Sequence, residues 1–247
     1  MTETLVITGA GGDIGSAVAS RMASPDTRVL LVDVDLPNLR AVESAVRDAY
    51  SEVAILQCDV SSEHDAVRYS RFASEFGGGS VDRFFNNAGI TGACVPLTEY
   101  PTETFDRVLA VNVRGVFLGL KHIGPLMGSG AAVVNTSSIG GSAGQANMAA
   151  YIASKHAVMG LTRTAALEWA ARGVRVNAIC PGPVAGQMMS TIFAGLGLDP
   201  QARAAQVPMG RLAHPSDVAD SVAFLMSSAA GHVTGTSIPV DGGRLAG

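Results

Sequence analysis

A tyrosine and a lysine four residues apart, Tyr151 and Lys155, are the side chains of this chain best placed for acid–base chemistry. If the segment is helical, the phenol and the ammonium share one face. A free phenol has a pKa near ~10, so a base active at neutral pH needs a pKa lower by ~2–3 units, or ~3–4 kcal/mol. A positive charge ~4 Å away supplies ~4 kcal/mol at an effective dielectric of ~20. Lys155 could therefore make Tyr151 a base, although ordinary surface helices carry the same spacing.

A glycine-rich segment near the amino terminus is typical of a phosphate-binding turn. It follows the apolar run Leu5–Thr8 and precedes an apolar helix. Glycines at such a turn let the backbone approach a pyrophosphate, and the helix N-terminus offers N–H groups with partial positive charge. We predict a dinucleotide site with contacts from Gly9, Gly12, Asp13, Ile14 and Gly15.

Asp33 ends the second predicted strand, eighteen residues beyond Gly15. A carboxylate there can accept hydrogen bonds from both hydroxyls of the adenosine ribose. It would repel a 2′-phosphate by ~1–4 kcal/mol per charge pair, and no basic residue lies at 9–15 or directly after Asp33. We therefore predict NAD as the cofactor, with Asp35 rather than Asp33 as the cap of the following helix.

A further acidic residue, Asp59, follows the third predicted strand. It is placed to meet the adenine amino group, but it could equally cap a helix that begins near Ser62. We assign Asp59 and the adjacent Val60 to the cofactor site and leave the capping alternative open.

Composition favours one soluble domain. The chain has 247 residues, 47% of them hydrophobic, and 29 glycines, as expected for buried parallel strands joined by tight turns. A net charge of −4 without a basic block argues against nucleic acid and anionic membranes as partners. No signal-peptide pattern and no membrane-spanning apolar run are found. We predict a cytoplasmic protein in which residues 1–247 form a single NAD-binding catalytic domain.

Cysteines and histidines show no metal-binding pattern. Cys58, Cys94 and Cys180 are odd in number and widely separated, as expected for reduced thiols in the cytosol. The five histidines also lack ligand spacing. We expect no metal site.

Short apolar runs alternate with amphipathic stretches from end to end. This pattern predicts an α/β fold, a single Rossmann-like doubly wound parallel sheet of about seven strands with helices on both faces. The predicted strands are Leu5–Thr8, Val29–Val34, Val53–Cys58, Arg83–Asn86, Ala132–Ser137, Arg175–Cys180 and Ser237–Val240. The predicted helices lie near 14–23, 36–49, 63–76, 102–127, 149–171 and 215–227.

The stretch from Pro181 to about Gly210 breaks this alternation. It is rich in glycine and small or apolar residues, and it is too long for an ordinary connection. We predict a substrate-binding lid over about 183–210 with a short helix of its own.

Together these motifs resemble the short-chain dehydrogenase/reductase family over essentially the whole chain. The segment from Thr8-Gly9 to Gly15 is similar to its glycine motif, and the carboxy-terminal Val240-Asp241-Gly242-Gly243 is also characteristic. The segment Asn86-Asn87-Ala88-Gly89 is similar to its strand-four signature, which implies contact of Asn87, Ala88 and Gly89 with the adenine-side ribose and support of the sheet.

The resemblance also implies a catalytic set of Asn112, Ser138, Tyr151 and Lys155. Ser138 stands thirteen residues before Tyr151 and is favoured over Ser137. In this family the tyrosine takes the proton of a substrate hydroxyl while hydride passes to the nicotinamide. The lysine lowers the pKa of the tyrosine and holds the nicotinamide ribose, the serine donates to the substrate oxygen, and the asparagine supports the lysine through water.

Near the nicotinamide, the resemblance implies contacts from Pro181, Gly182 and Val184. Two residues depart from the family pattern. Asp13 stands where the middle glycine of the motif is expected, and we predict that it caps its own helix and points away from the pyrophosphate. Gly186 stands where relatives often carry a threonine that meets the nicotinamide carboxamide, so we expect one hydroxyl contact to be missing.

The residues expected around the substrate are small or apolar. Gly140 leaves space beside the serine, while Gln145 and Met188 are predicted to contact substrate; Asn147, Met148, Met189, Ile192 and Phe193 are further candidates. Such a lining favours a neutral secondary alcohol or ketone, cyclic or polyol, over a strongly anionic one. A weaker resemblance of the segments 115–120 and 150–156 to bacterial members acting on cyclic ketones and sugars implies the same.

Two alternatives use the same fold. A reductase of 3-oxoacyl thioesters would prefer NADPH, which Asp33 argues against. A non-catalytic NAD-binding sensor would tend to lose the tyrosine or the lysine, and both are present. The resemblance further implies a homotetramer with two-fold interfaces on the helices near 102–127 and 149–171.

Overall fold

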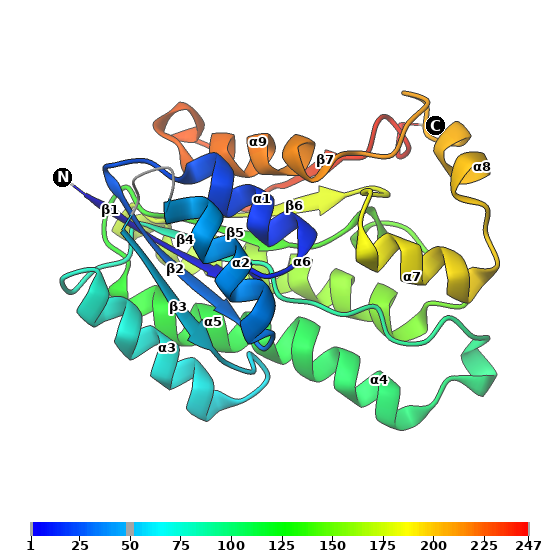
Figure 1. Cartoon of the computed structure of the whole chain (residues 1–247), viewed down its shortest axis with the longest axis horizontal. Helices are drawn as coiled ribbons and strands as arrows, with labels where there is room; N and C mark the ends of the chain where they lie inside the picture. The colour runs from blue at the N-terminus through cyan, green and yellow to red at the C-terminus, as the bar shows by residue number, and fades with distance from the viewer. Residues whose placement is uncertain (1, 48–51, 247) are drawn as a thin grey trace.

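The computed structural model describes residues 2–47 and 52–246. Within them the chain forms one parallel sheet with the strand order β3-β2-β1-β4-β5-β6-β7 (Figure 1). The strands are β1 (Glu3–Thr8), β2 (Thr27–Asp33), β3 (Glu52–Gln57), β4 (Arg83–Asn86), β5 (Ala132–Thr136), β6 (Arg175–Pro181) and β7 (Ser237–Val240). The predicted doubly wound α/β fold is therefore confirmed.

Helices cover both faces of the sheet. In Figure 1, α1 and α9 lie above it and α3, α4 and α5 below it, and α2 packs on the same face as α1 and α9. The bounds of the helices are α1 (Asp13–Met22), α2 (Leu36–Arg47), α3 (Glu63–Phe76), α4 (Thr102–Leu109), α5 (Gly115–Ile123), α6 (Ala149–Trp169), α7 (Gln187–Leu196), α8 (Pro200–Ala205) and α9 (Pro215–Met226). Residues 48 and 49 of the predicted helix 36–49 lie outside the described part of the chain.

Each central strand buries both of its faces, because successive side chains point to opposite sides of a sheet. In β1, Leu5 and Ile7 pack with α1, α2 and α9, whereas Val6 packs with α3, α5 and α6. All three side chains are fully buried. The near-continuous apolar runs of the sequence follow from this double burial.

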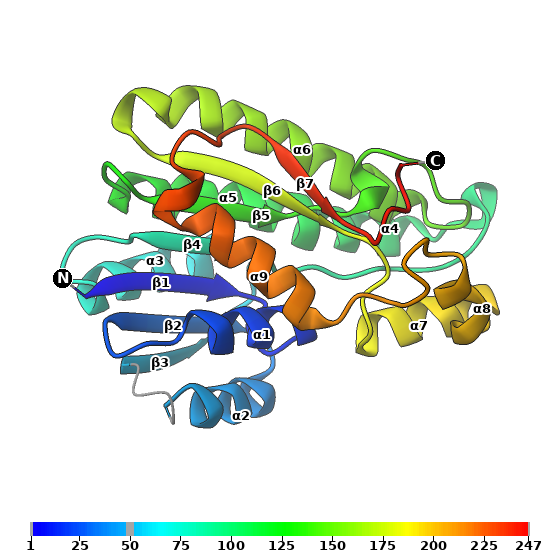
Figure 2. The same ribbon diagram turned by 90° about the horizontal axis from the view of Figure 1, so that it is seen from above.

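The strand order reverses between β1 and β4, whose neighbours lead away in opposite directions along the sheet. In open parallel sheets, ligands bind beyond the carboxyl ends of the strands at such a switch point. Figure 2 shows α7 and α8 beyond these ends, away from the α9 layer that covers the sheet. The lid therefore adjoins the expected ligand site.

Two predicted elements differ from the structure. The predicted helix 102–127 is divided into α4, a π-helical turn at Ala110–Arg114, α5 and a 3₁₀ turn at Gly124–Leu126. The lid contains two helices, α7 and α8, instead of one short helix. No helix in 2–47 and 52–246 is long and apolar enough to cross a membrane.

Candidate active site

One cavity of about 1130 Å³ runs along the carboxyl ends of the strands from the glycine-rich turn to the lid. It collects most of the residues that the sequence predicts for the site. Those lining it are Gly9, Gly12, Asp13, Ile14, Asp33, Asp59, Val60, Asn87, Ala88, Gly89, Ser138, Gly140, Gln145, Tyr151, Lys155, Pro181, Gly182, Val184 and Met188. Gly15 and Asn112, which were also predicted for the site, do not line the cavity themselves.

Tyr151 and Ser138 meet at the centre of the cavity. Tyr151 lies in the first turn of α6, and Ser138 follows β5 in extended conformation with 8% of its surface exposed. Both side chains line the cavity, and Ser138 lies near enough to the Tyr151 phenol to act on its pKa; Ser138 Oγ itself donates to the carbonyl of Pro181 at 3.5 Å and accepts from Gly140 N at 3.1 Å. The neighbouring Ser137 instead donates to the carbonyl of Lys155 at 2.9 Å. Of the two serines, Ser138 is thus the one beside the phenol, and its catalytic role stays a prediction.

Lys155 lies one turn further along α6, with 4% of its surface exposed. Its Nζ donates to the carbonyl of Thr136 at 2.9 Å and lies 5.6 Å from the ring centroid of Tyr151. Burial lowers the pKa of Lys155 to about 8, because the charged ammonium loses hydration. The ammonium is therefore held beside the phenol by the end of β5.

The pKa of Tyr151 is shifted in the direction opposite to the sequence prediction. Burial raises it, and the hydrogen bond with Ser138 only partly opposes this effect. The prediction of a net lowering by Lys155 is wrong because it counted the positive charge without the loss of hydration of the phenolate.

Asn112 lies in the π-helical turn between α4 and α5 and is fully buried. Its side-chain amide accepts from Ile90 N at 2.8 Å and donates to the carbonyl of Ile90 at 2.9 Å. It also donates to Ser154 Oγ at 3.0 Å. π-turns occur frequently at functional sites. Asn112 thus ties the loop after β4 to α6, next to Lys155.

The glycine-rich turn is tightly packed where α1 begins. A Cβ at Gly15 would lie 2.8 Å from the Cα of Ala10, so only glycine allows the helix to approach the turn this closely. Gly9 has φ of +64°, a region that favours glycine. Both positions are required by backbone geometry, whereas Gly12 and Ile14 face the cavity.

Asp33 connects the glycine-rich turn to the start of α2 in the cavity wall. Its Oδ2 accepts from Gly11 N at 2.9 Å and its Oδ1 from Asp35 N at 3.1 Å. Asp35 in turn accepts from Asn38 N at 3.0 Å, at the start of α2. Asp35 thus caps α2, as predicted, whereas Asp33 lies in the cavity wall and its contact with the ribose hydroxyls stays a prediction.

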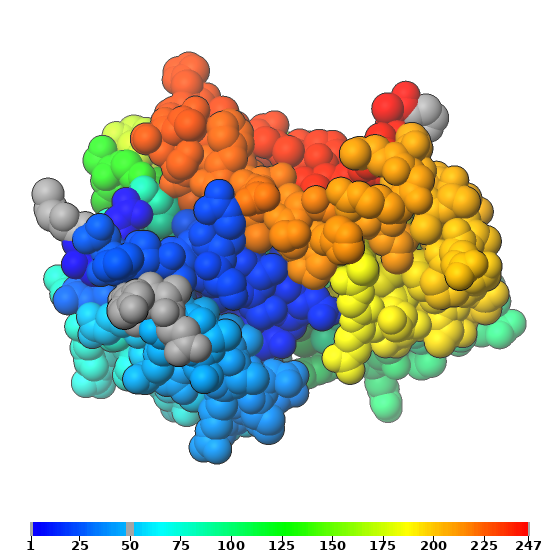
Figure 3. Space-filling model, turned by 45° about the horizontal axis from the view of Figure 1, so that its top comes forward, coloured from blue at the N-terminus to red at the C-terminus, as the bar shows by residue number. Residues whose placement is uncertain are grey.

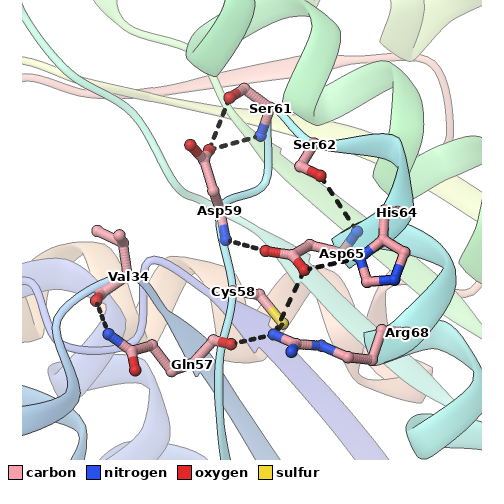
Figure 4. A network of polar contacts seen from close by, with 9 residues as sticks. All are labelled: Val34, Gln57, Cys58, Asp59, Ser61, Ser62, His64, Asp65 and Arg68. Carbon is pink, nitrogen blue, oxygen red and sulfur yellow. Dashed lines mark hydrogen bonds and ion pairs between the residues drawn. The ribbon is translucent and has the colours of Figure 1, made fainter.

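Asp59 lies in the cavity wall and belongs to a polar network around the start of α3 (Figure 4). Its Oδ1 accepts from the backbone and hydroxyl of Ser61, and Arg107 from α4 lies 3.3 Å from its Oδ2. Partial burial tends to raise the pKa of Asp59, but these hydrogen bonds and the Arg107 charge hold it below its ordinary value.

The cap of α3 is Ser62, whose Oγ accepts from Asp65 N at 3.3 Å. Asp65 Oδ2 accepts from Asp59 N at 2.8 Å, and Arg68 contacts the carbonyl of Gln57 (Figure 4). The capping alternative for Asp59 is therefore wrong.

Asn87 joins three segments around the glycine-rich turn. Its Nδ2 donates to the carbonyls of Thr8 and Gly9, and its Oδ1 accepts from the Thr136 hydroxyl at 3.0 Å. The backbone N–H of Asn87 donates to Thr8 Oγ1 at 2.9 Å. These bonds connect β1, β4 and β5 at their carboxyl ends and account for the predicted sheet-supporting role of this segment.

The sequence predicted that Asp13 caps its own helix, and this prediction is wrong. Gly12 is the N-cap of α1, and Asp13 is the first helical residue. The carboxylate of Asp13 instead accepts from Gln187 N at 2.9 Å, at the first turn of α7. The space-filling view shows the yellow lid segment beside the blue amino-terminal segment (Figure 3). The carboxylate is satisfied by the lid rather than by α1.

The predicted substrate residues lie at the lid end of the cavity, where Gly140, Gln145 and Met188 contribute to its wall. The further candidates Met148, Met189, Ile192 and Phe193 also line it. Asn147 has φ of +65°, and the described wall of the cavity does not include it. Its side chain is exposed, so its place in the substrate site stays a prediction.

Sequence reasoning missed several polar residues in the cavity wall. They are Asn38, Arg107, Arg203, Gln206 and Arg244. Arg203 lies on α8 and Arg244 in the carboxy-terminal turn after β7. The signal that could have found them was an arginine within the predicted lid and another directly after the carboxy-terminal glycine pair. No cluster of metal-ligating side chains occurs among residues 2–47 and 52–246.

A phosphate-binding turn at the switch point and a buried lysine beside a serine–tyrosine pair place this protein among nicotinamide-dependent oxidoreductases with a Rossmann-like sheet. A family model described as "Enoyl-(Acyl carrier protein) reductase" matches residues 9–244. The chain belongs to the short-chain dehydrogenase/reductase family.

Three relatives illustrate the similarity. Cis-4-hydroxycyclohexanecarboxylate dehydrogenase from Sinomonas cyclohexanicum is 42% identical, over 98% of this chain and 96% of the relative. Levodione reductase from Leifsonia aquatica is 38% identical, over 99% of this chain and 94% of the relative. The crystal structure of NAD⁺-bound xylitol dehydrogenase superimposes with a TM-score of 0.91 at 35% identity, covering 98% of each chain.

Proposed function

We propose that this protein catalyses reversible hydride transfer between NAD and a cyclic secondary alcohol or its ketone, with Tyr151 as the general acid and base. The observation that carries the proposal is that Tyr151, Ser138 and the buried Lys155 converge in the wall of one cavity that also contains the glycine-rich turn, with Lys155 Nζ 5.6 Å from the ring centroid of Tyr151. A proton-accepting phenol and a dinucleotide site in one cavity are the two parts that alcohol oxidation needs.

In the proposed oxidation, Tyr151 takes the proton of the substrate hydroxyl. Ser138 Oγ accepts from Gly140 N at 3.1 Å, so its own proton can be turned toward the substrate oxygen. Lys155 stabilises the phenolate electrostatically and reaches the nicotinamide ribose, and Asn112 holds the α6 segment that carries Lys155. Bound NAD supplies the hydride acceptor.

The cofactor residues fit NAD better than NADP. Gly9, Gly12, Asp13, Ile14 and Gly15 surround the pyrophosphate in this proposal; Asp33 receives the adenosine ribose hydroxyls; Asp59, Val60, Asn87, Ala88 and Gly89 hold the adenosine; and Pro181, Gly182 and Val184 hold the nicotinamide. The Asp33 carboxylate would face a 2′-phosphate with like charge. A positive group at this end, Arg107, is already directed to Asp59.

The proposed substrate class is supported by the wall around Tyr151 and by the relatives. Gly140 gives room beside Ser138, and Met188, Ile192 and Phe193 offer apolar surface for a ring. The names of two relatives above refer to cyclic substrates, levodione and a hydroxycyclohexanecarboxylate. We therefore propose an alicyclic secondary alcohol, held under the lid 183–210.

The direct test is NADH and NADPH formation, in parallel, over cyclic secondary alcohols, polyols and 3-hydroxyacyl thioesters. NADH formation with a cyclic alcohol, lost in Tyr151→Phe, would support the proposal. NADPH formation with a thioester would replace it by the 3-oxoacyl thioester reductase. NAD binding without turnover on any member would replace it by the non-catalytic sensor.

We further propose a cytoplasmic homotetramer. The described cysteines Cys58, Cys94 and Cys180 are free thiols, and exposed apolar side chains on α5 and α6, Phe117 and Leu167, offer surface for subunit contacts. Size-exclusion chromatography with light scattering tests the assembly, and a monomer would contradict it.

A further inference from the structure

Two arginines from distant parts of the chain meet in the wall of the cavity, at the end covered by the lid. Arg203 lies on α8 and Arg244 in the turn after β7, and both are half-buried. Gln206 holds both of them: Arg203 Nη1 donates to its Oε1 at 2.8 Å, and Arg244 Nη1 donates to its carbonyl at 3.2 Å. Gln206 thus positions both guanidinium groups, Arg203 through its side-chain amide oxygen and Arg244 through its backbone carbonyl.

The backbone fixes the two segments to each other. Met209 N donates to the carbonyl of Gly242 at 3.2 Å, and Gly243 lies beside Pro208. Gly242 and Gly243 have φ of +62° and +89°, which turn the chain so that Arg244 follows directly. The arginine pair is thus part of the folded structure of the lid and the carboxy-terminal turn.

Neither guanidinium has a carboxylate within ion-pair distance in 2–47 and 52–246, whereas Arg211 on the same segment pairs with Asp217 at 2.6 Å. Burial lowers the pKa of Arg203, and the Arg244 charge adds to the shift. Two like charges held near each other and only partly hydrated are costly unless an anion compensates them. The site therefore carries positive charge that no carboxylate of the described residues compensates, and an anionic ligand would neutralise it.

We propose that Arg203 and Arg244 form a subsite for the carboxylate of the substrate, with the substrate hydroxyl at Tyr151. A guanidinium binds a carboxylate through two parallel N–H···O bonds, which fixes orientation as well as charge. Apolar side chains of the lid, Leu196 and Leu198, line the same cavity. The substrate class is thus an alicyclic hydroxy acid or the corresponding keto acid.

This inference rests on the proposed function and revises the neutral substrate expected from sequence. That expectation used residues near the catalytic serine and on α7, which are small or apolar. The charged end of the cavity comes from α8 and from the carboxy-terminal turn. A ligand with an apolar ring, a hydroxyl and a carboxylate offers a group to each of these parts of the cavity wall.

The test compares NADH formation from cis-4-hydroxycyclohexanecarboxylate with that from its neutral carboxamide. We expect wild-type kcat/KM to be about 30-fold or more higher for the acid, mainly through KM, as for hydrogen bonds to a charged group. Arg203→Gln and Arg244→Gln should each reduce this preference about tenfold or more, and Arg203→Lys should reduce it less. The matched control is Arg40→Gln, at an exposed position on α2, which should keep the wild-type preference.

Binding of non-reactive probes separates the subsite from the reaction. Cyclohexanecarboxylate should bind to the NADH complex more tightly than cyclohexanecarboxamide, and this difference should shrink in both arginine variants, whose thermal unfolding verifies that they fold. If neither cis-4-hydroxycyclohexanecarboxylate nor its carboxamide is oxidised but the non-reactive probes show this binding difference, the proposed function fails and the subsite stands. Equal kcat/KM for acid and amide overturns the subsite and leaves the proposed function in place. The carboxylate subsite is also overturned if cyclohexyl phosphate binds more tightly than cyclohexanecarboxylate. The same holds if the arginine substitutions change only the KM for NAD.

Discussion

The carboxylate of Asp13 accepts a hydrogen bond from the backbone N–H of Gln187 at 2.9 Å, which joins the glycine-rich turn to the first turn of α7. A Cβ at Gly186 would lie 2.5 Å from Asp13 Cγ, so the carboxylate fills the space of a side chain at 186. Gly186 also has φ of +156°. The two departures from the family pattern, Asp13 and Gly186, are therefore structurally coupled.

This coupling predicts a partial rescue. Gly186→Thr should lower the free energy of unfolding by about 1–3 kcal/mol, because the new side chain overlaps Asp13 and the backbone conformation favours glycine. Adding Asp13→Gly should restore the part caused by the overlap. Urea denaturation of both single variants and the double variant measures the interaction energy. Strictly additive effects would contradict the coupling.

Asp13→Gly alone should change NAD affinity by less than about tenfold, or ~1.4 kcal/mol, because the carboxylate is directed to α7. Isothermal titration with NAD provides the measurement. A hundredfold gain in affinity would mean that Asp13 faces the pyrophosphate.

The sequence predicts the sheet well because its information is local. Each central strand is an apolar run of a few residues, and the motifs at strand ends converge at one edge whatever the details of the loops. The positions of Asp33, Asp59 and Ser138 in one cavity follow from this rule, and Tyr151 joins them from the first turn of α6. Only the hydrogen-bond and ion-pair partners of these residues had to be learned from the structure.

Contacts between distant segments are what local patterns do not contain. Gln187, the partner of Asp13, lies on the lid, and Gln206 binds both Arg203 and Arg244, which are far apart in the sequence. The π-turn at Asn112 interrupts a stretch that has ordinary helical periodicity. The free-energy cost of burying the Tyr151 phenolate is also absent from local patterns, so the direction of the pKa shift of Tyr151 was predicted wrongly.

Alcohol oxidation should require alkaline pH. Burial raises the pKa of Tyr151, so the phenolate that accepts the proton is a small fraction at neutral pH. We expect kcat/KM for oxidation to rise by up to about tenfold per pH unit from pH 6 to about 8 and to gain less above pH 8, where Lys155, with a pKa of about 8, loses the charge that stabilises the phenolate, while ketone reduction does not rise. Steady-state rates in both directions measure this, and a flat oxidation profile would contradict it. Tyr151→Phe should abolish turnover and still bind NADH.

Lys155 should make stability depend on pH. Its pKa is lowered to about 8 in the folded protein, from 10.5. Below the folded value both states are protonated and the cost of burying the charge is fully present; between the two values the unfolded state binds more protons, so stability rises with pH. Relative to Lys155→Met, the wild-type free energy of unfolding should increase by about 1.5 kcal/mol from pH 8 to 9.5.

Urea unfolding of wild type and Lys155→Met at pH 8, 8.5, 9 and 9.5 tests this slope. The raised pKa of Tyr151 affects both proteins, and the range stays below the pKa of a free phenol. A difference between the two proteins that is constant across this range would show that Lys155 is not held as a desolvated ammonium.

Cofactor preference should depend on the charge of Asp33 rather than on its hydrogen bond to Gly11. Asp33→Asn keeps an oxygen that can accept from Gly11 N, now 2.9 Å from Oδ2, but removes the negative charge. The ratio of kcat/KM for NADP to that for NAD should therefore rise about tenfold or more, since like-charge repulsion contributes ~1–4 kcal/mol. Asp35→Asn is the matched control, because Asp35 caps α2 through Asn38 N, and its effect on the ratio should be much smaller. An unchanged ratio in Asp33→Asn would mean that this carboxylate does not face the 2′ position, and the NAD assignment would lose its physical basis.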